Sequence, residues 1–568
     1  MKSIFKKITN SKAGLLLVIV LLIGINWLAS LYHARIDLTN EKRFTLSEPT
    51  KNVLRKLDNE VEIDIFLKGE FPSAFKKLAN STEETLQEFQ EVAGSKLRYR
   101  FISPDDLVDG TSVTYADTLS ALGLDPINLK SQLKSGEQQQ FVYPAALVKY
   151  GDQILPVDLY SGNKTVITPS ELNSAEALME YKFANAIEKL ATPVKPLIAY
   201  SDGNGEPTGD NVYDLVNNVL LKNYNLARFN INIQPVIPDT FKLLLVVKPT
   251  VAFTDDEKFK IDQFVMNGGK VLWFIDELNA EMDSLQIKNE VIAYDRGLNL
   301  GDLLFKYGVR INPDLVMDLQ CDFLPFDVNG NGQFEMLHWN YFPLFESKGD
   351  NLIDKNLGLV AGRFVNSIDT VEADGIKKTI LLSSSSNSRT IGTPALISGQ
   401  ENVNAPEDDK FKSANIPVAV LLEGRFGSMY KYRASQTIKD TFQKYGGVFQ
   451  TQCINDNKMI VVADGDIALN SATKDGPLPM GMNQYTYGSQ YQYQFANREF
   501  VENCLDYLIN PYGLTEAKAK DYTLRLLDVK KIDEQRSLWQ VINIAGPIVL
   551  VLLFAFIYQW WRKRKYAK

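Results

Sequence analysis

The chain has 568 residues, which at about one domain per 150 residues allows three or four structural units. Hydrophobic residues make up 45% of it, enough for ordinary cores, and its three cysteines form no CxxC or Cys/His cluster. The sequence therefore supports neither a disulfide framework nor a zinc site, and we expect no cofactor. With only two histidines, His33 and His338, histidine-based chemistry is disfavoured.

Two segments resemble membrane spans. Residues 13–32 (AGLLLVIVLLIGINWLASLY) and 541–561 (VINIAGPIVLVLLFAFIYQWW) contain no charge, and each is long enough to cross a bilayer as a helix. Basic residues precede the first and follow the second, so the positive-inside rule places both termini in the cytoplasm. We expect a protein integral to the inner membrane, with residues from about 33 to 540 in the periplasm. A cleaved signal peptide is the alternative for the first segment, although its apolar run exceeds the usual length and no convincing A-x-A site follows.

The predicted exterior is acidic. Nine of the 61 basic residues lie in the two tails, which leaves 52 basic against 69 acidic residues and a net charge of −17. Such a charge disfavours nucleic acid and anionic lipid surfaces as partners. We therefore expect no nucleic-acid binding.

Residues 36–190 carry the first predicted exterior domain. Ser47 is a helix N-cap candidate, with Pro49 just inside the helix. Polar, loop-rich sequence separates the first strands from the last ones and ends near Gln140. The other predicted elements are strands over 61–67 and 96–102, a helix over 71–92, a hairpin over 141–150 and 153–160, and a helix over 170–190. This order, β-α-β and then β-β-α, predicts a thioredoxin-like domain, but one without the cysteines of redox chemistry.

A second domain is predicted over residues 195–510, after a linker that is marked by prolines. Thr254 and Glu257 form a capping box. Strands are expected over 197–201, 227–233, 241–247 and 270–275, and helices over 211–224 and 254–265. An insertion is expected at about 281–455. Later elements of the same domain are strands over 417–423 and 458–463 and a helix over 495–509. The alternation indicates a doubly wound α/β sheet. Residues 514–540 would connect this domain to the second membrane helix.

The first strand-to-helix turn of this domain reads YSDGNGEPTGD over residues 200–210. Its glycines give G-x-G-x-x-x-G, one residue too long for a dinucleotide fingerprint, and the next strand does not end in an acid for a ribose hydroxyl. The sequence also contains no G-x-S-x-G elbow and no Walker A motif. These features disfavour nucleotide binding, acyl transfer and ATPase activity.

Several carboxylates follow predicted strands, where a parallel sheet presents ligands. Helix caps and turns use the same residues, so a purely structural role is the alternative. The predicted ligand or docking crevice comprises Ser201, Asp202, Asn204, Gly205, Glu206, Asp464, Asp466 and Asn470. Asp327-x-Asn329-x-Asn331 resembles the start of a calcium loop, but His338 stands where the bidentate Glu belongs, and a polar turn is the alternative.

Three short stretches support a family resemblance. Ile36-Asp-Leu-Thr39, Arg43-Phe-Thr-Leu-Ser-Glu-Pro-Thr50 and Leu54-Arg-Lys-Leu57 resemble the amino-terminal signature of ABC-transporter auxiliary proteins, more closely the gliding-motility-associated GldG type of Bacteroidetes. Further similarity occurs at 307–312, 315–318, 461–466 and 524–528. The resemblance implies an amidotransferase-like α/β domain of the kind called GIFT. It also implies two partners, a multi-span ABC permease and a separate cytoplasmic ABC ATPase.

The same resemblance bears on the turn. The family turn usually reads Gly-His-Gly-Glu, whereas this chain has Gly203-Asn204-Gly205-Glu206, which puts in doubt any role for an imidazole. We therefore expect a non-enzymatic auxiliary subunit of an ABC-type complex associated with gliding motility. Two alternatives remain: a sugar- or peptide-binding module that uses the crevice, and a hydrolase with Asp202 or Glu206 as its base.

Overall fold

The computed structural model describes most of the chain. The described residues are 20, 22–24, 45–69, 71–108, 110–124, 126–133, 136–160, 167–192, 194–282, 284–285, 290–328, 331–347, 351–399, 408–474, 476–510, 513–514, 517 and 529–566. The chain divides into two compact units, Met1–Asp521 and Tyr522–Lys568. Most of the predicted span 13–32 lies outside the described residues, and so do residues 36–44 of the family signature and most of 514–528.

The first part of the larger unit contains a four-stranded mixed sheet in the order β2-β1-β5-β6. β1 runs parallel to β2 and antiparallel to β5, and β5 runs antiparallel to β6. The elements are α3 (Glu48–Arg55), β1 (Val61–Ile65), α4 (Ser73–Ala93), η1 (Gly94–Lys96), β2 (Leu97–Phe101), α5 (Tyr115–Ala121), β3 (Ile127–Leu133), β4 (Gly136–Val142), β5 (Ala145–Tyr150), β6 (Gln153–Asp158), α6 (Pro169–Ala177) and α7 (Met179–Ala191). These strands and helices follow the predicted β-α-β and β-β-α order; the likeness to thioredoxin itself stays a prediction.

Two local predictions in this part were incomplete. The stretch expected to be loop contains helix α5 and the β3–β4 ladder. Polar residues that favour a loop act here as a helix cap, because Thr114 and Asp117 form a capping box. The helix expected over 170–190 is divided at Leu178 into α6 and α7. Ser47 caps α3 as predicted, since its hydroxyl accepts the Thr50 N–H at 3.4 Å.

The second part contains a ten-stranded sheet in the order β15-β16-β19-β22-β23-β10-β9-β7-β8, with β17 paired to β16. Its elements are β7 (Leu197–Asp202), η2 (Gly209–Val212), η3 (Asp214–Leu220), α8 (Leu221–Asn223), β8 (Asn225–Asn230), β9 (Phe241–Val247), α9 (Asp255–Met266), β10 (Lys270–Phe274), β11 (Leu278–Asn279), β12 (Glu290–Asp295), α11 (Gly301–Tyr307), β13 (Val309–Ile311), β14 (Asp314–Asp318), β15 (Cys321–Phe326), β16 (Glu335–Ser347), β17 (Val360–Ala361), β18 (Ile368–Thr370), β19 (Ile376–Ser383), β20 (Ser388–Gly392), β21 (Ala395–Ser398), η4 (Asp408–Lys410), β22 (Pro417–Gly424), α12 (Gln436–Lys444), β23 (Asn457–Val462), η5 (Asp466–Ala468), β24 (Ala472–Thr473), β25 (Gly476–Pro477) and α13 (Asn497–Ile509).

Five neighbouring strands of this sheet are parallel: β8, β7, β9, β10 and β23. Numbered along the chain they stand in the order 2-1-3-4-5, which is a doubly wound arrangement whose switch point lies between β7 and β9. The insertion at about 281–455 contains the predicted strand over 417–423, which is β22, together with further strands. It extends the sheet with β22, β19, β16 and β15, each antiparallel to its neighbour.

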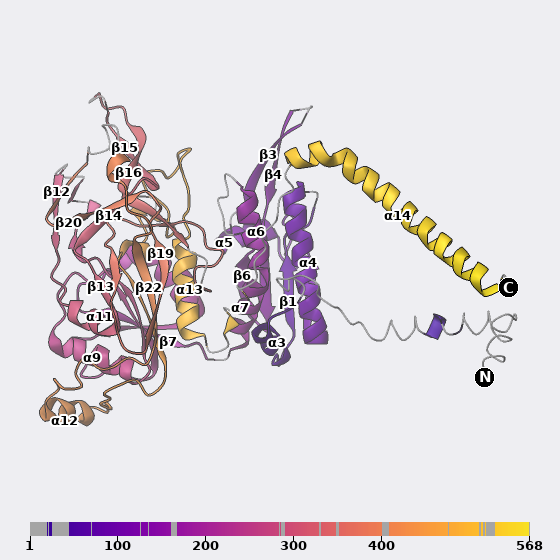
Figure 1. Ribbon diagram of the computed structural model, residues 1–568. Helices are drawn as coiled ribbons and strands as arrows, with labels where there is room; N and C mark the ends of the chain where they lie inside the picture. Colours follow the sequence, from indigo (N-terminus) through magenta and orange to yellow (C-terminus); the bar gives the residue numbers. More distant parts are fainter. Residues whose placement is uncertain are drawn as a thin grey trace. The chain divides into compact units, whose positions relative to one another are not determined.

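Both faces of the parallel strands are covered. Leu244 and Val246 of β9 belong to one buried cluster together with Phe259 of α9. Leu245 belongs to the other cluster, together with Phe500 of α13. Helix α9 therefore covers one face and α13 the other (Figure 1). The continuous apolar run of β9 follows from this arrangement, because neither set of alternating side chains faces water.

The helix expected over 211–224 is wound differently from the prediction. It consists of the 3-10 turn η2, the π-helix η3 and the short helix α8. Asp214, at the start of the π-helix, is buried and pairs with Arg498 of α13 at 2.6 Å, while its backbone N–H donates to Asn470 Oδ1 at 3.0 Å. π-Turns of this kind occur often at functional sites.

The smaller unit contains helix α14 (Val529–Tyr566), with Pro547 inside it. Within the described residues, its segment Trp539–Arg564 is the one long and apolar enough to cross a membrane. This segment includes the second predicted span, residues 541–561.

The predicted capping box at α9 gives a stability test. Thr254 Oγ1 accepts the Glu257 N–H at 3.3 Å, and the Thr254 N–H donates to Glu257 Oε2 at 2.8 Å. We expect Thr254→Ala to lower the unfolding free energy by about 1 kcal/mol, because a helix-end N–H loses its acceptor. Urea unfolding followed by the fluorescence of buried Trp273 measures the change. Thr208→Ala is the matched control, since Thr208 caps η2 without a side-chain hydrogen bond. Equal effects of the two substitutions would contradict the expectation.

Candidate functional site

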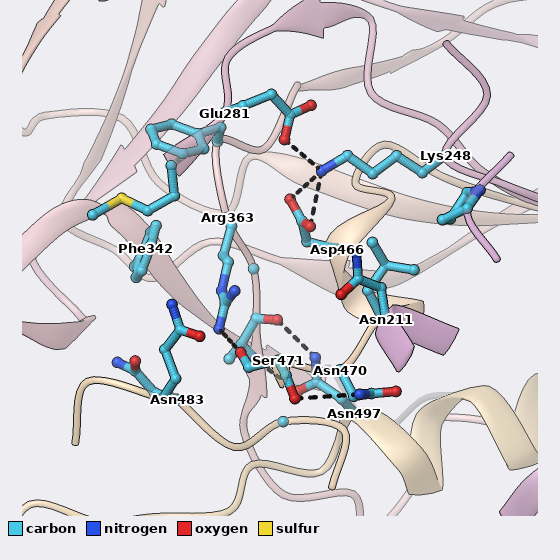
Figure 2. Close-up of a pocket in the computed structure, with 18 of the residues that line it drawn as sticks. Asn211, Lys248, Glu281, Phe342, Arg363, Asp466, Asn470, Ser471, Asn483 and Asn497 are labelled. Atoms are coloured by element: carbon cyan, nitrogen blue, oxygen red, sulfur yellow. Dashed lines mark hydrogen bonds and ion pairs between the residues drawn. The ribbon is translucent and has the colours of Figure 1, made fainter. Parts of the chain in front are cut away.

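A cavity of about 390 Å³ opens at the carboxyl edge of the parallel strands. Its lining includes Gly205 from the turn after β7, Lys248 and Thr250 from the end of β9, and Asp466 from the turn after β23. The cavity therefore lies at the switch point, where open α/β sheets bind their ligands. Its volume is within the range of small-molecule sites. Figure 2 shows this lining.

A buried ammonium group joins three strand ends at one side of the cavity. Lys248 Nζ lies 2.8 Å from Asp466 and 3.1 Å from Glu281 (Figure 2), and it lies 3.2 Å from Asp276. Burial opposes the charge of Lys248, but the three carboxylates outweigh burial and hold the pKa of Lys248 well above its ordinary value. The ammonium is therefore a fixed cation that ties β9 to the turns after β10 and β23.

The packing of the Lys248 side chain requires a glycine at position 465. A Cβ on Gly465 would lie 2.5 Å from the Cβ of Lys248 and 2.6 Å from its Cγ. Only a residue without a side chain leaves room for the aliphatic part of Lys248 at this position. Lys248 itself has a φ of 44°, in the left-handed region that few non-glycine residues adopt. The close approach of these two turns thus depends on Gly465.

Two acids lie beneath the cavity. Asp464 is fully buried and accepts the backbone N–H groups of Arg363 at 2.9 Å and Asp466 at 2.8 Å. Burial raises the pKa of Asp464 well above its ordinary value, and the charges of Asp466 and Asp276 add to the rise. Burial likewise raises the pKa of Asp276, against the effect of Lys248. Burial and neighbouring acids therefore oppose the charged form of Asp464, whereas its two backbone hydrogen bonds stabilise that form.

In the turn after β7, a carboxylate from the same turn binds the backbone N–H groups. Glu206 Oε2 accepts the backbone N–H groups of Gly203 at 3.1 Å and Asn204 at 2.8 Å. In phosphate-binding folds such strand-to-helix turns leave these donors free for the ligand. Here the N–H groups of Gly203 and Asn204 are occupied by Glu206.

Asn204 holds the turn in place through hydrogen bonds to neighbouring segments. Its carbonyl accepts the N–H groups of Thr250 and Val251 at 2.8 and 2.9 Å. Its side chain donates to Glu257 Oε2 at 3.2 Å. These contacts tie the turn to the end of β9 and the start of α9, so Asn204 is a structural residue.

The predicted crevice residues separate into two groups. Gly205, Asp466 and Asn470 line the cavity. The others do not line it: Asp464 lies beneath it, Asn204 and Glu206 are buried in the turn, Ser201 is buried at the end of β7, and Asp202 pairs with Arg228 of β8 at 2.8 Å. The turn therefore contributes mainly its backbone to the cavity.

Sequence reasoning missed Lys248, Arg363 and Phe342. A charge directly after the apolar strand 241–247 was a signal for Lys248, the same one that singled out the aspartates. Arg363 and Phe342 come from the insertion, where no local pattern marked them. The Arg363 guanidinium stands 5.3 Å from the Phe342 ring centroid and donates to Ser471 Oγ at 3.1 Å (Figure 2).

The calcium-loop fragment lies elsewhere. The carboxylate of Asp327 accepts the N–H groups of Asn331 at 3.1 Å and Gly332 at 3.0 Å, as in a polar turn. Asn329 lies outside the described residues. His338 Nδ1 lies 2.9 Å from the Cys321 carbonyl oxygen.

Comparisons with known proteins identify the family. A family model described as an ABC-type uncharacterized transport system matches residues 195–504, more than half of the chain. The chain belongs to this family. The match covers the ten-stranded sheet and every residue that lines the cavity. A second model, described as a domain of unknown function, matches residues 40–149.

Relatives at greater distance were also found. A protein of Borreliella burgdorferi described as uncharacterized is 22% identical over 426 residues, which cover 71% of this chain and 76% of that protein. Among solved structures, the N-terminal domain of mmIFT52 is 13% identical and covers 55% of this chain and 97% of its own, with a TM-score of 0.31. The exo-beta-1,4-mannosidase Op5Man5 of an Opitutaceae bacterium is 9% identical over 74% of this chain and 51% of its own, with a TM-score of 0.18. At these TM-scores neither structure bears on the fold.

We expect Lys248→Met to lower the unfolding free energy by about 3–5 kcal/mol, because it removes the ammonium that pairs with Asp466 and that lies closest to buried Asp276. Denaturant unfolding of the purified protein measures the loss. Lys242→Met, at an exposed position of the same strand, is the matched control and should change the free energy little. A loss below about 1 kcal/mol for Lys248→Met would contradict a structural role for the ammonium.

The raised pKa of Glu277 makes the stability of the protein depend on pH. Burial raises the pKa of Glu277 to about 7, and Asp295 adds to the rise. Because the folded pKa is raised, the contribution of Glu277 to stability is present below the unfolded pKa, about 4.3, and is lost as the pH rises through 7. We expect Glu277→Gln to raise the melting temperature relative to the parent more at pH 8 than at pH 5. Glu290→Gln, at an exposed position, is the control. A pH-independent difference for Glu277→Gln would contradict the expectation.

Proposed function

We propose that this chain is a non-catalytic, membrane-anchored subunit of an ABC-type transport complex whose extracytoplasmic cavity binds a ligand. The observation that carries the proposal is the cavity at the switch point of the family domain, lined by charges that are largely paired with one another. Paired charges hold a site in shape but supply no free base or nucleophile. The family membership supports a role beside transporter components.

The membrane topology is part of the proposal. Trp539–Arg564 is apolar enough for an anchor, and the basic residues from Arg562 onward would remain in the cytoplasm. A second anchor at residues 13–32 would place residues 33–540 in the periplasm. In this arrangement the first sheet would be a thioredoxin-like domain, and the ten-stranded sheet a GIFT-type amidotransferase-like domain.

The partners would be a multi-span permease and a cytoplasmic ATPase. The sequence has no Walker A motif, so the energy of ATP would come from a separate chain. We infer that permease motion passes through the membrane helices and residues 514–540 to the periplasmic body. By the resemblance to GldG-type proteins of Bacteroidetes, the complex would take part in gliding motility.

The hydrolase alternative is less well supported. Glu206 is held by the N–H groups of its own turn, and Asp202 is paired with Arg228. Neither carboxylate lines the cavity. A base must reach the proton that it removes, and these two acids are turned to other partners. A binding role uses the cavity as it stands, and sugars and peptides are both candidate ligands.

Co-purification from the native membrane tests the proposal. We expect tagged full-length protein, extracted in a mild detergent, to recover a multi-span permease and an ATPase with a Walker A motif. An unrelated tagged protein with one membrane helix serves as the control for nonspecific recovery. Recovery of neither partner, or equal recovery by the control, would contradict the proposal.

A further inference from the structure

One cation in the cavity wall forms no direct ion pair within the described residues. Arg363 donates to Ser471 Oγ at 3.1 Å and stacks against Phe342, and no carboxylate of the described residues lies within ion-pair distance of its guanidinium. Lys248, the other lining cation, is surrounded by three carboxylates. The guanidinium of Arg363 is half-buried and lines the cavity, so its N–H groups that do not bond Ser471 can reach an acceptor on a ligand.

The carboxylates of the lining already have their own partners. Glu281 pairs with Lys248 and with Arg296 Nη2 at 2.8 Å. Asp466 pairs with Lys248 at 2.8 Å. Asp322 accepts the Asn483 side-chain amide and the Phe323 N–H, both at 2.8 Å. Arg363 is therefore the one lining cation that no carboxylate of the described residues holds in an ion pair, and the charge of Asp322 acts on it only from a distance.

We propose that this cavity binds a small ligand through a carboxylate group that pairs with Arg363. A planar guanidinium fits a carboxylate with two parallel hydrogen bonds, and the contact with Phe342 holds its plane. Because Nη2 is directed to Ser471, other guanidinium N–H groups remain for the ligand. The inference deepens the proposed function and rests on the cavity being a ligand site.

Two further groups are suited to the rest of such a ligand. The side-chain amides of Asn211 and Gln484 line the same cavity, and the hydrogen bonds of the described chain do not engage them. Each offers both a donor and an acceptor. A carboxylate with neighbouring hydroxyl or amide groups, at the end of a peptide or in an acidic sugar, has the chemical partners that these three side chains require.

A phosphate group fits this site less well. Phosphate carries more charge than one guanidinium balances, and the backbone donors of Gly203 and Asn204 are already held by Glu206. Lys248, which could otherwise assist, is neutralised by its three carboxylates. The observations therefore favour a monoanionic carboxylate.

Matched probe pairs test the carboxylate. Full-length protein in mild detergent is titrated calorimetrically with trialanine and trialanine amide, with glucuronic acid and glucose, and with inorganic phosphate. We expect the acid of at least one pair to bind at least about tenfold more tightly than its neutral partner, and phosphate to bind more weakly than that acid. The preferred pair distinguishes a peptide terminus from an acidic sugar. Equal affinity within both pairs, or tightest binding of phosphate, would overturn the proposal.

Variants locate the binding to this cavity. Arg363→Gln keeps a donor for Ser471 but removes the charge, and we expect it to weaken binding of the preferred acid at least about tenfold. Arg433→Gln, at a largely exposed arginine that does not line the cavity, is the matched control. Melting temperatures of both variants show whether the fold is kept, and Asn211→Ala, at an exposed position, supplies a second lining variant. Unchanged affinity in folded Arg363→Gln would overturn the assignment.

The two proposals fail separately. We expect Arg363→Gln to recover the permease and ATPase as well as the parent does, because Arg363 lies in the cavity wall. Loss of carboxylate binding with partners retained would leave the transporter role standing. Absence of partners from the parent protein would refute that role, whatever the cavity binds.

Discussion

A single buried ammonium group organises the carboxyl edge of the large sheet. Lys248 binds carboxylates from positions 276, 281 and 466, which are far apart in the sequence. Buried ion pairs add little net stability compared with apolar packing, but removing one partner is expensive. The cluster therefore acts chiefly as a geometric constraint. It brings the turn after β23 close to the end of β9 and so shapes the cavity.

The same edge has lost the usual means of binding phosphate. In many doubly wound folds the first turn offers backbone N–H groups to an anion. Here Glu206 occupies those groups from within the chain, and Asn204 ties the turn to its neighbours. The lining that remains free comes largely from other segments, above all from Arg363 in the insertion. The cavity lies at the usual ligand position of a doubly wound sheet, but the side chains that line it come mainly from other segments.

The sequence predicted the parallel part of the sheet well, because buried strands such as 241–247 and capped helices such as the one begun by Thr254 carry strong local signals. Of the antiparallel extension it predicted only the strand over 417–423, which is β22. Strands β16 and β19 lie between loop-rich segments, and their pairing is set by contacts far along the chain. The prediction of one helix over 211–224 was wrong in the type of helix. A π-helix forms there, and it begins at the buried Asp214–Arg498 pair.

The candidate site was predicted only in part, for a related reason. Residues that follow strands can be placed at a sheet edge from the sequence, and Gly205, Asp466 and Asn470 do line the cavity. Whether a side chain at that edge points into the cavity depends on its partners. Asp202 turns to Arg228, and Ser201 is buried, so neither reaches it. Arg363 lies in an insertion whose path no local pattern gives.

We propose that the domain over residues 195–504 uses the cavity beside Arg363 as a ligand site within a membrane complex. The most direct measurement is a cryo-EM map of the complex, purified from native membranes without added ligand. We expect density for a small molecule within hydrogen-bond distance of the Arg363 guanidinium, and contact between α14 and other membrane helices. A cavity filled by protein side chains, with α14 isolated in the detergent belt, would contradict it.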